Sequence, residues 1–243
     1  SKQFWALRCY LKQNRVSISL GARVQRYLEH AWRSQQGSVS VDKIPIFSSL
    51  SDQLRSELQF EIFVPQLSVH PLFSHLNTEA GMTMSRLANT AIERKVYALR
   101  DTLFIPGEQA MHMCFVRSGK LEYVQVDASG KRRSEQVENE EDWITEHVLW
   151  MVSWTHVGRL TARMECELLL VEPEKFSAVI HLNPLAFEIA SVYARNFVKW
   201  VASSEADRMS DVCQGEDVGH RVRKMMGLEG AALARAKAGW AQK

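Results

Sequence analysis

Apolar side chains recur every three or four positions through the first part of the chain, a spacing that predicts amphipathic helices. It predicts one helix over residues 2–13 and a second over 20–34, separated by the sequence NRVSIS, whose β-branched and serine residues disfavour a helix. The second helix gathers apolar residues on one face: Val24, Tyr27, Leu28, Ala31 and Trp32. Such a face needs a packing partner.

A leucine repeat at spacing four predicts a third helix over residues 51–63. Ser51 or Asp52 can cap its free backbone amides. Because proline disfavours a helix interior and restricts the residue before it, Pro65 and Pro71 are expected to bound a short extended or turn segment.

A fourth helix is predicted over residues 78–94, and after it the period of the pattern changes from 3.6 to 2. The buried face of that helix would be formed by Met84, Leu87, Ala88 and Ala91. The alternating runs predict strands over 96–105, 113–116, 121–126 and 165–171. Turns are expected at Gly107, Gly119 and Gly130, and many short strands with glycine turns are typical of a small antiparallel barrel or roll.

Helical periodicity returns after Pro173, first around Phe176, Val179 and Ile180 and then in a longer helix after Pro184. The predicted fold class is therefore α+β: a helical segment, then a small antiparallel β-roll of the jelly-roll kind flanked by helices. The expected division is 1–78, 79–204 and 205–243, with the roll at about 96–172 and its following helices at about 173–204.

The final stretch, 205–243, is punctuated by glycines, each of which costs about 1 kcal/mol in a helix interior. We therefore expect a mobile or weakly helical tail. A basic amphipathic helix that binds a specific partner is the alternative.

Composition and charge restrict the class of protein. The chain has 243 residues with a net charge of +2, and its four cysteines are widely spaced, which favours reduced thiols in a cytosolic setting. Neither a signal peptide nor an apolar run long enough for a membrane span is recognised, so we expect a soluble piece that can belong to a larger membrane protein. Residues 1–35 carry seven basic side chains against one acid, and they are expected either to contact anionic lipid or an acidic neighbouring subunit, or simply to be solvated.

The spacing of residues gives little support for metal binding, catalysis or nucleic-acid binding. The eight histidines lack the spacing of a helical metal pair, so no metal site is expected. No hydrolase, P-loop or kinase signature is present, so we do not expect an enzyme. Basic residues are not interleaved with aromatic ones on a sheet face, and no nucleic-acid partner is expected.

The order of parts resembles two adjacent modules of cyclic-nucleotide-binding-domain channels. The first part, LRCYLKQNRVSISLGARVQRYLEHAW followed by SLSDQLRSEL and HPLF, looks like their C-linker. The second, LFIPGE, MCFVRSGKLEYV and ECELLLVEPEKFSAV, resembles their cyclic-nucleotide-binding domain. The resemblance spans roughly residues 4–203 and extends to the hyperpolarisation-activated, cyclic-nucleotide-gated, ether-à-go-go and plant Shaker-like families. Residues 1–78 would then be the C-linker.

In that superfamily the phosphate-binding cassette begins Phe-Gly-Glu and ends Arg-Thr-Ala or Arg-Ser-Ala. Here it would begin Ile144-Thr145-Glu146, and an ungapped count back from Cys166 and Phe176 puts His156 at the arginine position. The resemblance therefore implies a ligand site formed by Ile144, Thr145, Glu146, His147, His156, Val157 and, from a shifted register, Arg159.

The replacements in this cassette are expected to weaken phosphate binding. A mostly neutral histidine makes one directed contact where arginine makes a bidentate pair, and threonine replaces the glycine that lets backbone approach phosphate. Glu146 would remain as a ribose acceptor. Cyclic AMP or cyclic GMP is thus expected to bind weakly or not at all, and no other cofactor is implied.

The cassette is also rich in large apolar side chains: Trp143, Leu149, Trp150, Met151, Val152 and Trp154. Either these side chains fill the nucleotide's volume or they form ordinary core packing. Only four residues separate Glu108 from Met113, where the superfamily has a further strand and turn. The resemblance therefore also implies a roll that is trimmed on this side.

The function implied by the resemblance is a cytoplasmic gating and assembly module of a homotetrameric, voltage-gated cation channel, with potassium favoured. Its partners would be neighbouring subunits, through the C-linker, and the transmembrane domain of the channel. A functional cyclic-nucleotide sensor of a channel and a non-channel regulatory module are the alternatives.

Overall fold

The computed structural model describes residues 2–37, 50–127, 129–138, 142–204, 209–213 and 217–228. The described helices are α1 (Lys2–Gln13), α2 (Ile18–Gly37), α3 (Asp52–Leu67), α4 (Pro71–Glu79), α5 (Gly81–Thr90), α6 (His147–Trp150), α7 (Pro173–His181), α8 (Pro184–Ser203) and α9 (Val218–Met225). The described strands are β1 (Ile92–Tyr97), β2 (Thr102–Phe104), β3 (Met113–Ser118), β4 (Leu121–Val126), β5 (Arg132–Val137), β6 (Trp143–Ile144), β7 (Gly158–Ala162), β8 (Cys166–Val171) and β9 (Val212–Cys213).

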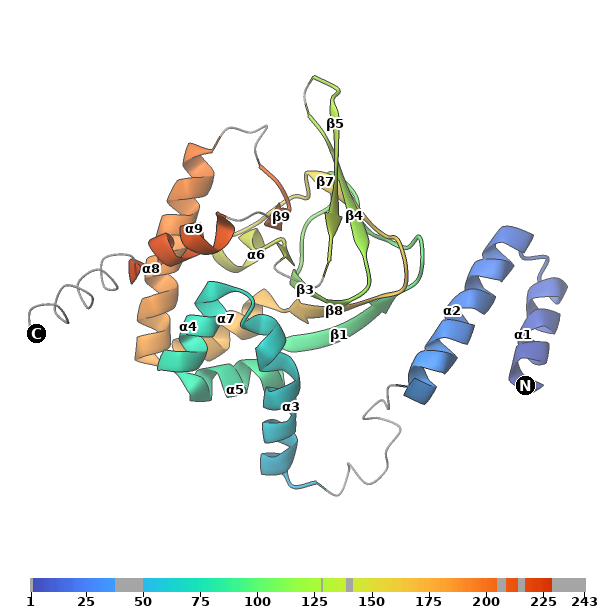
Figure 1. Cartoon of the computed structure of the whole chain (residues 1–243), viewed down its shortest axis with the longest axis horizontal. Coiled ribbons are helices and arrows are strands. Elements are labelled where there is room, and N and C mark those ends of the chain that lie inside the picture. Colours follow the sequence, from blue (N-terminus) through green and yellow to red (C-terminus); the bar gives the residue numbers. More distant parts are fainter. Residues whose placement is uncertain are drawn as a thin grey trace, which may run out of the picture.

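Two antiparallel sheets form a β-roll, which confirms the predicted α+β class (Figure 1). One sheet has the strand order β1-β8-β3-β6-β9 and the other β2-β7-β4-β5. Alternate residues of β4, β7 and β8 point into the roll, as the period of 2 predicts, and these include Leu121, Tyr123, Leu160 and Leu168. The roll therefore has an apolar interior of its own.

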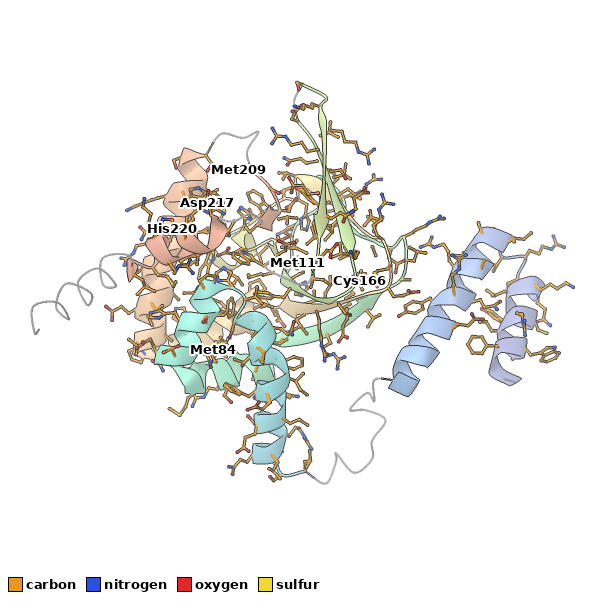
Figure 2. All side chains as sticks on the ribbon, in the orientation of Figure 1. Met84, Met111, Cys166, Met209, Asp217 and His220 are labelled. Atoms are coloured by element: carbon orange, nitrogen blue, oxygen red, sulfur yellow. The ribbon has the colours of Figure 1, made fainter. Side chains whose placement is uncertain are left out.

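Helices α3, α4, α5, α7, α8 and α9 gather on one side of the roll and pack against the sheet that contains β1, β3 and β6 (Figure 1). Their shared core contains Phe73, Met84, Phe115 and Tyr193, each fully or almost fully buried. Met84 lies among the helices, whereas Cys166 lies in the roll (Figure 2). The short helix α6 joins β6 to β7 at the boundary between these two cores.

The structure corrects two helix boundaries. Helix α3 begins with the predicted Ser51 cap but continues through Pro65 to Leu67, because the residues around that proline, such as Val64, are buried against the helical core. Pro71 is then the first residue of α4 rather than the end of an extended segment, a position where its missing N–H is not needed.

The predicted helix over 78–94 is wrong at both ends. Ala80, with φ −141°, separates α4 from α5, and α5 ends at Thr90. Ile92 to Tyr97 form β1 because they pair along their whole length with β8. The predicted burial of Met84, Leu87, Ala88 and Ala91 is confirmed.

The predicted strand over 96–105 is interrupted by a turn. Asp101 accepts a hydrogen bond from the backbone N–H of Ala98, and Arg100 adopts a φ of 69°, so β1 and β2 are separate strands in different sheets. The sequence pattern did not predict β5, β6, β7 or β9. Between Phe104 and Met113 the described chain forms a single bridge, from Gln109 to Thr155.

The expectation of a mobile or weakly helical tail needs correction over its described residues. Val212 and Cys213 form β9 against β6, and α9 buries Val218, Val222 and Met225. The helix forms although it contains Gly219, because the burial of these apolar side chains outweighs the cost of that glycine, and Gly227 follows its end. Residues 229–243 lie outside the described residues. The division of the chain at residues 78 and 204 stays a prediction.

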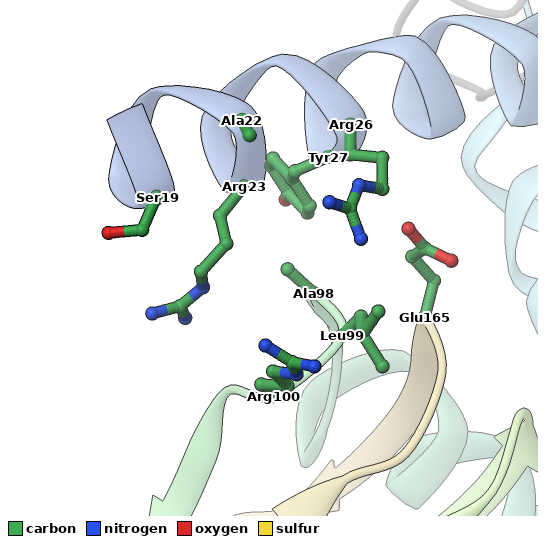
Figure 3. A pocket seen from close by; sticks show the side chains of 9 residues that line it. All are labelled: Ser19, Ala22, Arg23, Arg26, Tyr27, Ala98, Leu99, Arg100 and Glu165. Atoms are coloured by element: carbon green, nitrogen blue, oxygen red, sulfur yellow. The ribbon is translucent and has the colours of Figure 1, made fainter. Parts of the chain in front are cut away.

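The α1–α2 pair agrees closely with the two helices predicted over 2–13 and 20–34. Helix α2 meets the roll through an ion pair of Arg23 with Asp101, in which Nη2 and Oδ1 are 3.0 Å apart. A cavity of about 220 Å³ opens beside this contact, with Arg26 and Tyr27 on the helix side and Arg100 on the turn (Figure 3). The side chains of Ala31 and Trp32, predicted to lie on the apolar face of α2, lie outside the described residues.

Candidate functional site

The segment between β6 and β7 lies where the roll meets the helices, and a distant part of the chain returns beside it. Residues 209–213 run along β6, with Trp143 opposite Cys213 and Ile144 opposite Val212. Gln125 on β4 fixes the start of this segment by donating a hydrogen bond to the carbonyl of Met209, 2.9 Å away. The pairing brings Asp211 to the cassette.

The carboxylate of Asp211 is completely buried and accepts hydrogen bonds from five groups. Oδ2 accepts from the backbone N–H groups of Val157 and Gly158, both at 2.9 Å, and from the hydroxyl of Tyr123 at 2.8 Å. Oδ1 accepts from Nε1 of Trp154 at 2.7 Å and from Nδ1 of His156 at 3.1 Å. Because an ionised carboxylate can only accept, Nδ1 of His156 carries the proton.

Burial alone would raise the pKa of Asp211, but the hydrogen bonds from His156, Trp154 and Tyr123 outweigh it and lower that pKa below its ordinary value. The carboxylate is therefore ionised at neutral pH. Adjacent backbone N–H groups with convergent side-chain donors form an anion-binding site. In this structure the anion is supplied by the chain itself.

The close fit depends on Gly158. A Cβ atom at this position would lie 2.3 Å from the ring of Tyr123, so no larger residue fits without moving that ring. The same ring carries the hydroxyl that binds Asp211, and the N–H of Asp211 donates back to this hydroxyl at 3.2 Å. Gly158 thus lets backbone and ring approach the carboxylate together.

Glu146 faces the helices instead of the roll. Its carboxylate accepts hydrogen bonds from Nε1 of Trp143 at 2.7 Å, Nε1 of Trp150 at 3.0 Å and the hydroxyl of Tyr193 at 2.6 Å. Nε2 of His70 lies 3.2 Å away, out of line for a well-directed hydrogen bond. Burial opposes ionisation, yet His70 and these donors lower the pKa of Glu146. Both oxygens are engaged, so this carboxylate ties the cassette to α8.

Thr145, which the sequence resemblance aligns with a cassette glycine, has a φ of 60°, in the left-handed region that glycine favours. Its backbone N–H donates to the carbonyl of Asp211 at 2.6 Å. Its buried hydroxyl has no hydrogen-bond partner among the described residues. The conformation expected of a cassette glycine is therefore retained by a residue that is strained in it.

His147 and His156 both stack on aromatic rings. His147 lies 3.8 Å from the ring of Trp154, and burial lowers its pKa to about 4. His156 lies 3.6 Å from the ring of Phe104, nearly parallel to it. Each imidazole therefore has one face covered by an aromatic ring.

The structure brings together only part of the predicted ligand site. Thr145, His156 and Val157 surround the Asp211 segment. Ile144 lies in the roll core, and Glu146 and His147 face the helical core. Arg159 lies exposed on the outer face of β7, opposite Val124.

Sequence reasoning missed Asp211, Trp154 and Tyr123 as partners in one site. Asp211 falls in the stretch expected to be mobile, and no motif or spacing marks it. Of the large cassette side chains, Trp143, Trp150 and Trp154 use their indole N–H groups on the two carboxylates, whereas Val152 is fully exposed.

A cavity of about 260 Å³ remains on the other side of the cassette, between β1, β2 and the loop that follows β2. Thr145, His156, Phe104, Lys95 and Cys114 are among the residues that line it. In the described ranges, no three His, Cys, Asp or Glu side chains converge in a way that would hold a metal ion. None of the described helices combines the length and apolar character needed to cross a membrane.

Comparison with known proteins does not identify a family or a function for this site. No family model and no curated protein matches the chain. Among solved structures, the chain is similar to the N-terminal domain of a transcriptional regulator from Streptomyces coelicolor A3(2), at 22% sequence identity. The match covers 58% of this chain and 95% of that chain, with a TM-score of 0.44, a likeness too weak to support an argument about function.

Proposed function

We propose that this chain is a self-liganded regulatory module of the cyclic-nucleotide-binding-domain type. In this proposal it acts as the cytoplasmic gating and assembly module of a tetrameric, voltage-gated cation channel, with potassium favoured, and it works by binding and movement rather than catalysis. The observation that carries the self-liganded part is the buried carboxylate of Asp211 on the amides of Val157 and Gly158. The channel part rests on the sequence resemblance.

The negative charge of Asp211 and its covalent attachment to the chain both argue against regulation by a free cyclic nucleotide. A cyclic phosphate carries one negative charge, as Asp211 does, so both cannot occupy the same N–H groups. A ligand tethered through the chain acts at an effective concentration on the order of millimolar. A free nucleotide would have to compete with it without a bidentate arginine, since His156 contributes one hydrogen bond.

The segment that carries Asp211 connects the cassette to helices α8 and α9, so a movement at the cassette can reach them. Asp211 is followed by β9 and α9, and α9 is joined to α8 through Asn196 Nδ2, which donates to the carbonyl of Met225 at 2.8 Å. Arg221 of α9 also lies over the ring of Trp200 on α8, 4.3 Å from its centre. Movement of Asp211 would therefore be transmitted through β9 to α9 and α8, which is a suitable two-state change for gating.

Titration calorimetry with cyclic AMP and cyclic GMP tests the self-liganded part. Wild type is expected to give no binding heat at micromolar concentrations of either nucleotide, and Glu146→Ala is expected to behave in the same way. Micromolar binding by wild type that is lost in Glu146→Ala would instead favour the sensor alternative. That alternative draws its support from the N–H groups of Val157 and Gly158, which suit a phosphate once Asp211 has left.

The channel part has a separate and simpler test. The gene should encode, upstream of Ser1, six hydrophobic spans and a TxGYG-like selectivity filter. If the upstream sequence lacks them, the module belongs to another kind of regulatory protein, and the self-liganded site would stand independently of that result.

A further inference from the structure

The outer face of the sheet β2-β7-β4-β5 points away from the helices that pack on the other sheet. Among the described elements, α3, α5 and α6 contact strands of the other sheet. On β4 the outward residues are Glu122, Val124 and Val126, because Leu121 and Tyr123 point into the roll. Val126 is 59% exposed, so this apolar side chain has little cover on the face.

A groove of about 550 Å³ crosses this face. Its apolar residues include Val124, Val126 and Val157, and its basic residues are Arg132, Arg159 and Arg163. We call this surface the outer groove. Its size falls within the usual range for ligand sites, and its lining combines an apolar floor with a few charged groups at the sides.

The charges in the outer groove do not balance one another. The single carboxylate, Glu122, pairs with Arg163 and also accepts a hydrogen bond from the hydroxyl of Ser134 at 3.1 Å. Arg132 and Arg159 are exposed, and among the described residues neither lies within ion-pair distance of a carboxylate, although Arg132 attracts Glu122 from further away. Two guanidinium groups are thus available to an anionic partner, and their planar geometry suits carboxylates.

The sheet register sets the distance between these two arginines. Arg159 is opposite Val124 and Arg132 is opposite Val126, so they lie on either side of β4 and two residues apart along it. Standard strand spacing and rise then separate their Cα atoms by about 12 Å, along a diagonal over the two valines. In an extended peptide, residues four apart on one face are separated by about 13 Å, with one residue between them on that face.

We propose that the outer groove binds an extended acidic segment of a partner protein, with the pattern acidic-x-apolar-x-acidic. The two carboxylates pair with Arg132 and Arg159, and the central apolar side chain lies on Val124 and Val126. The groove also borders the cassette, since Val157 supplies one of the two N–H groups that hold Asp211 and Arg159 follows Gly158, which supplies the other. A partner here lies against β7, whose first residue, Gly158, donates its N–H to the self-ligand.

Fluorescence anisotropy with a labelled peptide containing Glu-Ser-Val-Ser-Glu tests the proposal on the full chain at low salt. Wild type is expected to bind with a Kd below about 1 mM. Arg132→Gln and Arg159→Gln are each expected to weaken binding about tenfold, because each removes a charge-assisted contact. Arg86→Gln, at an exposed position on α5, is the matched control and should leave the affinity unchanged.

Three results would overturn the proposal. The first is no binding of the acidic peptide, or equal binding of a peptide in which both glutamates are glutamines. The second is an affinity that Arg132→Gln and Arg159→Gln leave unchanged although both variants keep the circular dichroism spectrum of wild type. The third is binding to phosphatidylserine vesicles that depends on these two arginines while the peptide does not bind, which would identify the face as a membrane contact.

Discussion

Thr145 is a point of local strain at the residue scale. A β-branched side chain at a φ of 60° costs about 1–2 kcal/mol, and its buried hydroxyl lacks a partner among the described residues. Thr145→Gly is therefore expected to raise the free energy of unfolding by about 1 kcal/mol, after the extra chain entropy of glycine is subtracted. Chemical denaturation measures this change. A decrease in stability would mean that the packing of the threonine outweighs its strain.

His147 gives the fold a specific pH dependence. Its pKa is about 4 when folded, against about 6.5 in an unfolded chain. Between these values the unfolded state binds more protons, so stability falls as pH is lowered from about 6.5 to about 4, by on the order of 3 kcal/mol. The pKa values of Asp211 and Glu146 are lowered, so these carboxylates lose their stabilising effect only at more acidic pH.

Denaturation curves measured from pH 7 to pH 4 test whether His147 causes this loss of stability. His147→Phe keeps a ring against Trp154 and should remove most of the pH dependence in this window. His181→Gln, an exposed position at the end of α7, should keep it. Identical slopes in wild type and His147→Phe would contradict the assignment.

At the scale of elements, the chain forms helices where the apolar period is strong. Helices α1 and α2 were predicted with nearly correct ends, and α7 and α8 were predicted at their observed places, because their apolar faces are continuous. Strand β5, with the sequence RRSEQV, has almost no apolar alternation, and it exists because it pairs with β4. Strand β9 is two residues long and is positioned by contacts far away in sequence.

The candidate site could be predicted only in part, because it too depends on contacts between residues far apart in the sequence. The sequence resemblance, with Thr145 in place of glycine and His156 in place of arginine, directed attention to this segment. The group that occupies it, Asp211, comes from more than fifty residues downstream of His156. A contact of this kind depends on tertiary structure, and a single sequence contains no local signal for it.

At the scale of the whole molecule, the α1–α2 pair exposes apolar side chains that suit a partner subunit. Trp5 is 66% exposed and Tyr10 62%. If this pair assembles the proposed tetramer, wild type should sediment as a tetramer, and Trp5→Ser with Tyr10→Ser should shift it to smaller species. Met82→Ser, at a 77% exposed position on α5, is the control. A monomeric wild type, or assembly that survives the double change, would remove the basis for assembly through these helices.

The hydrogen exchange of two backbone amides tests most directly whether Asp211 occupies the cassette. The N–H groups of Val157 and Gly158 donate to Asp211, so their hydrogen exchange, measured by NMR, should be slow in wild type and unchanged by millimolar cyclic AMP. In Asp211→Ala both should exchange about tenfold faster or more, while amides in the centre of β8 stay protected. Fast exchange of Val157 and Gly158 in wild type, or protection that appears only when nucleotide is added, would contradict a self-liganded cassette.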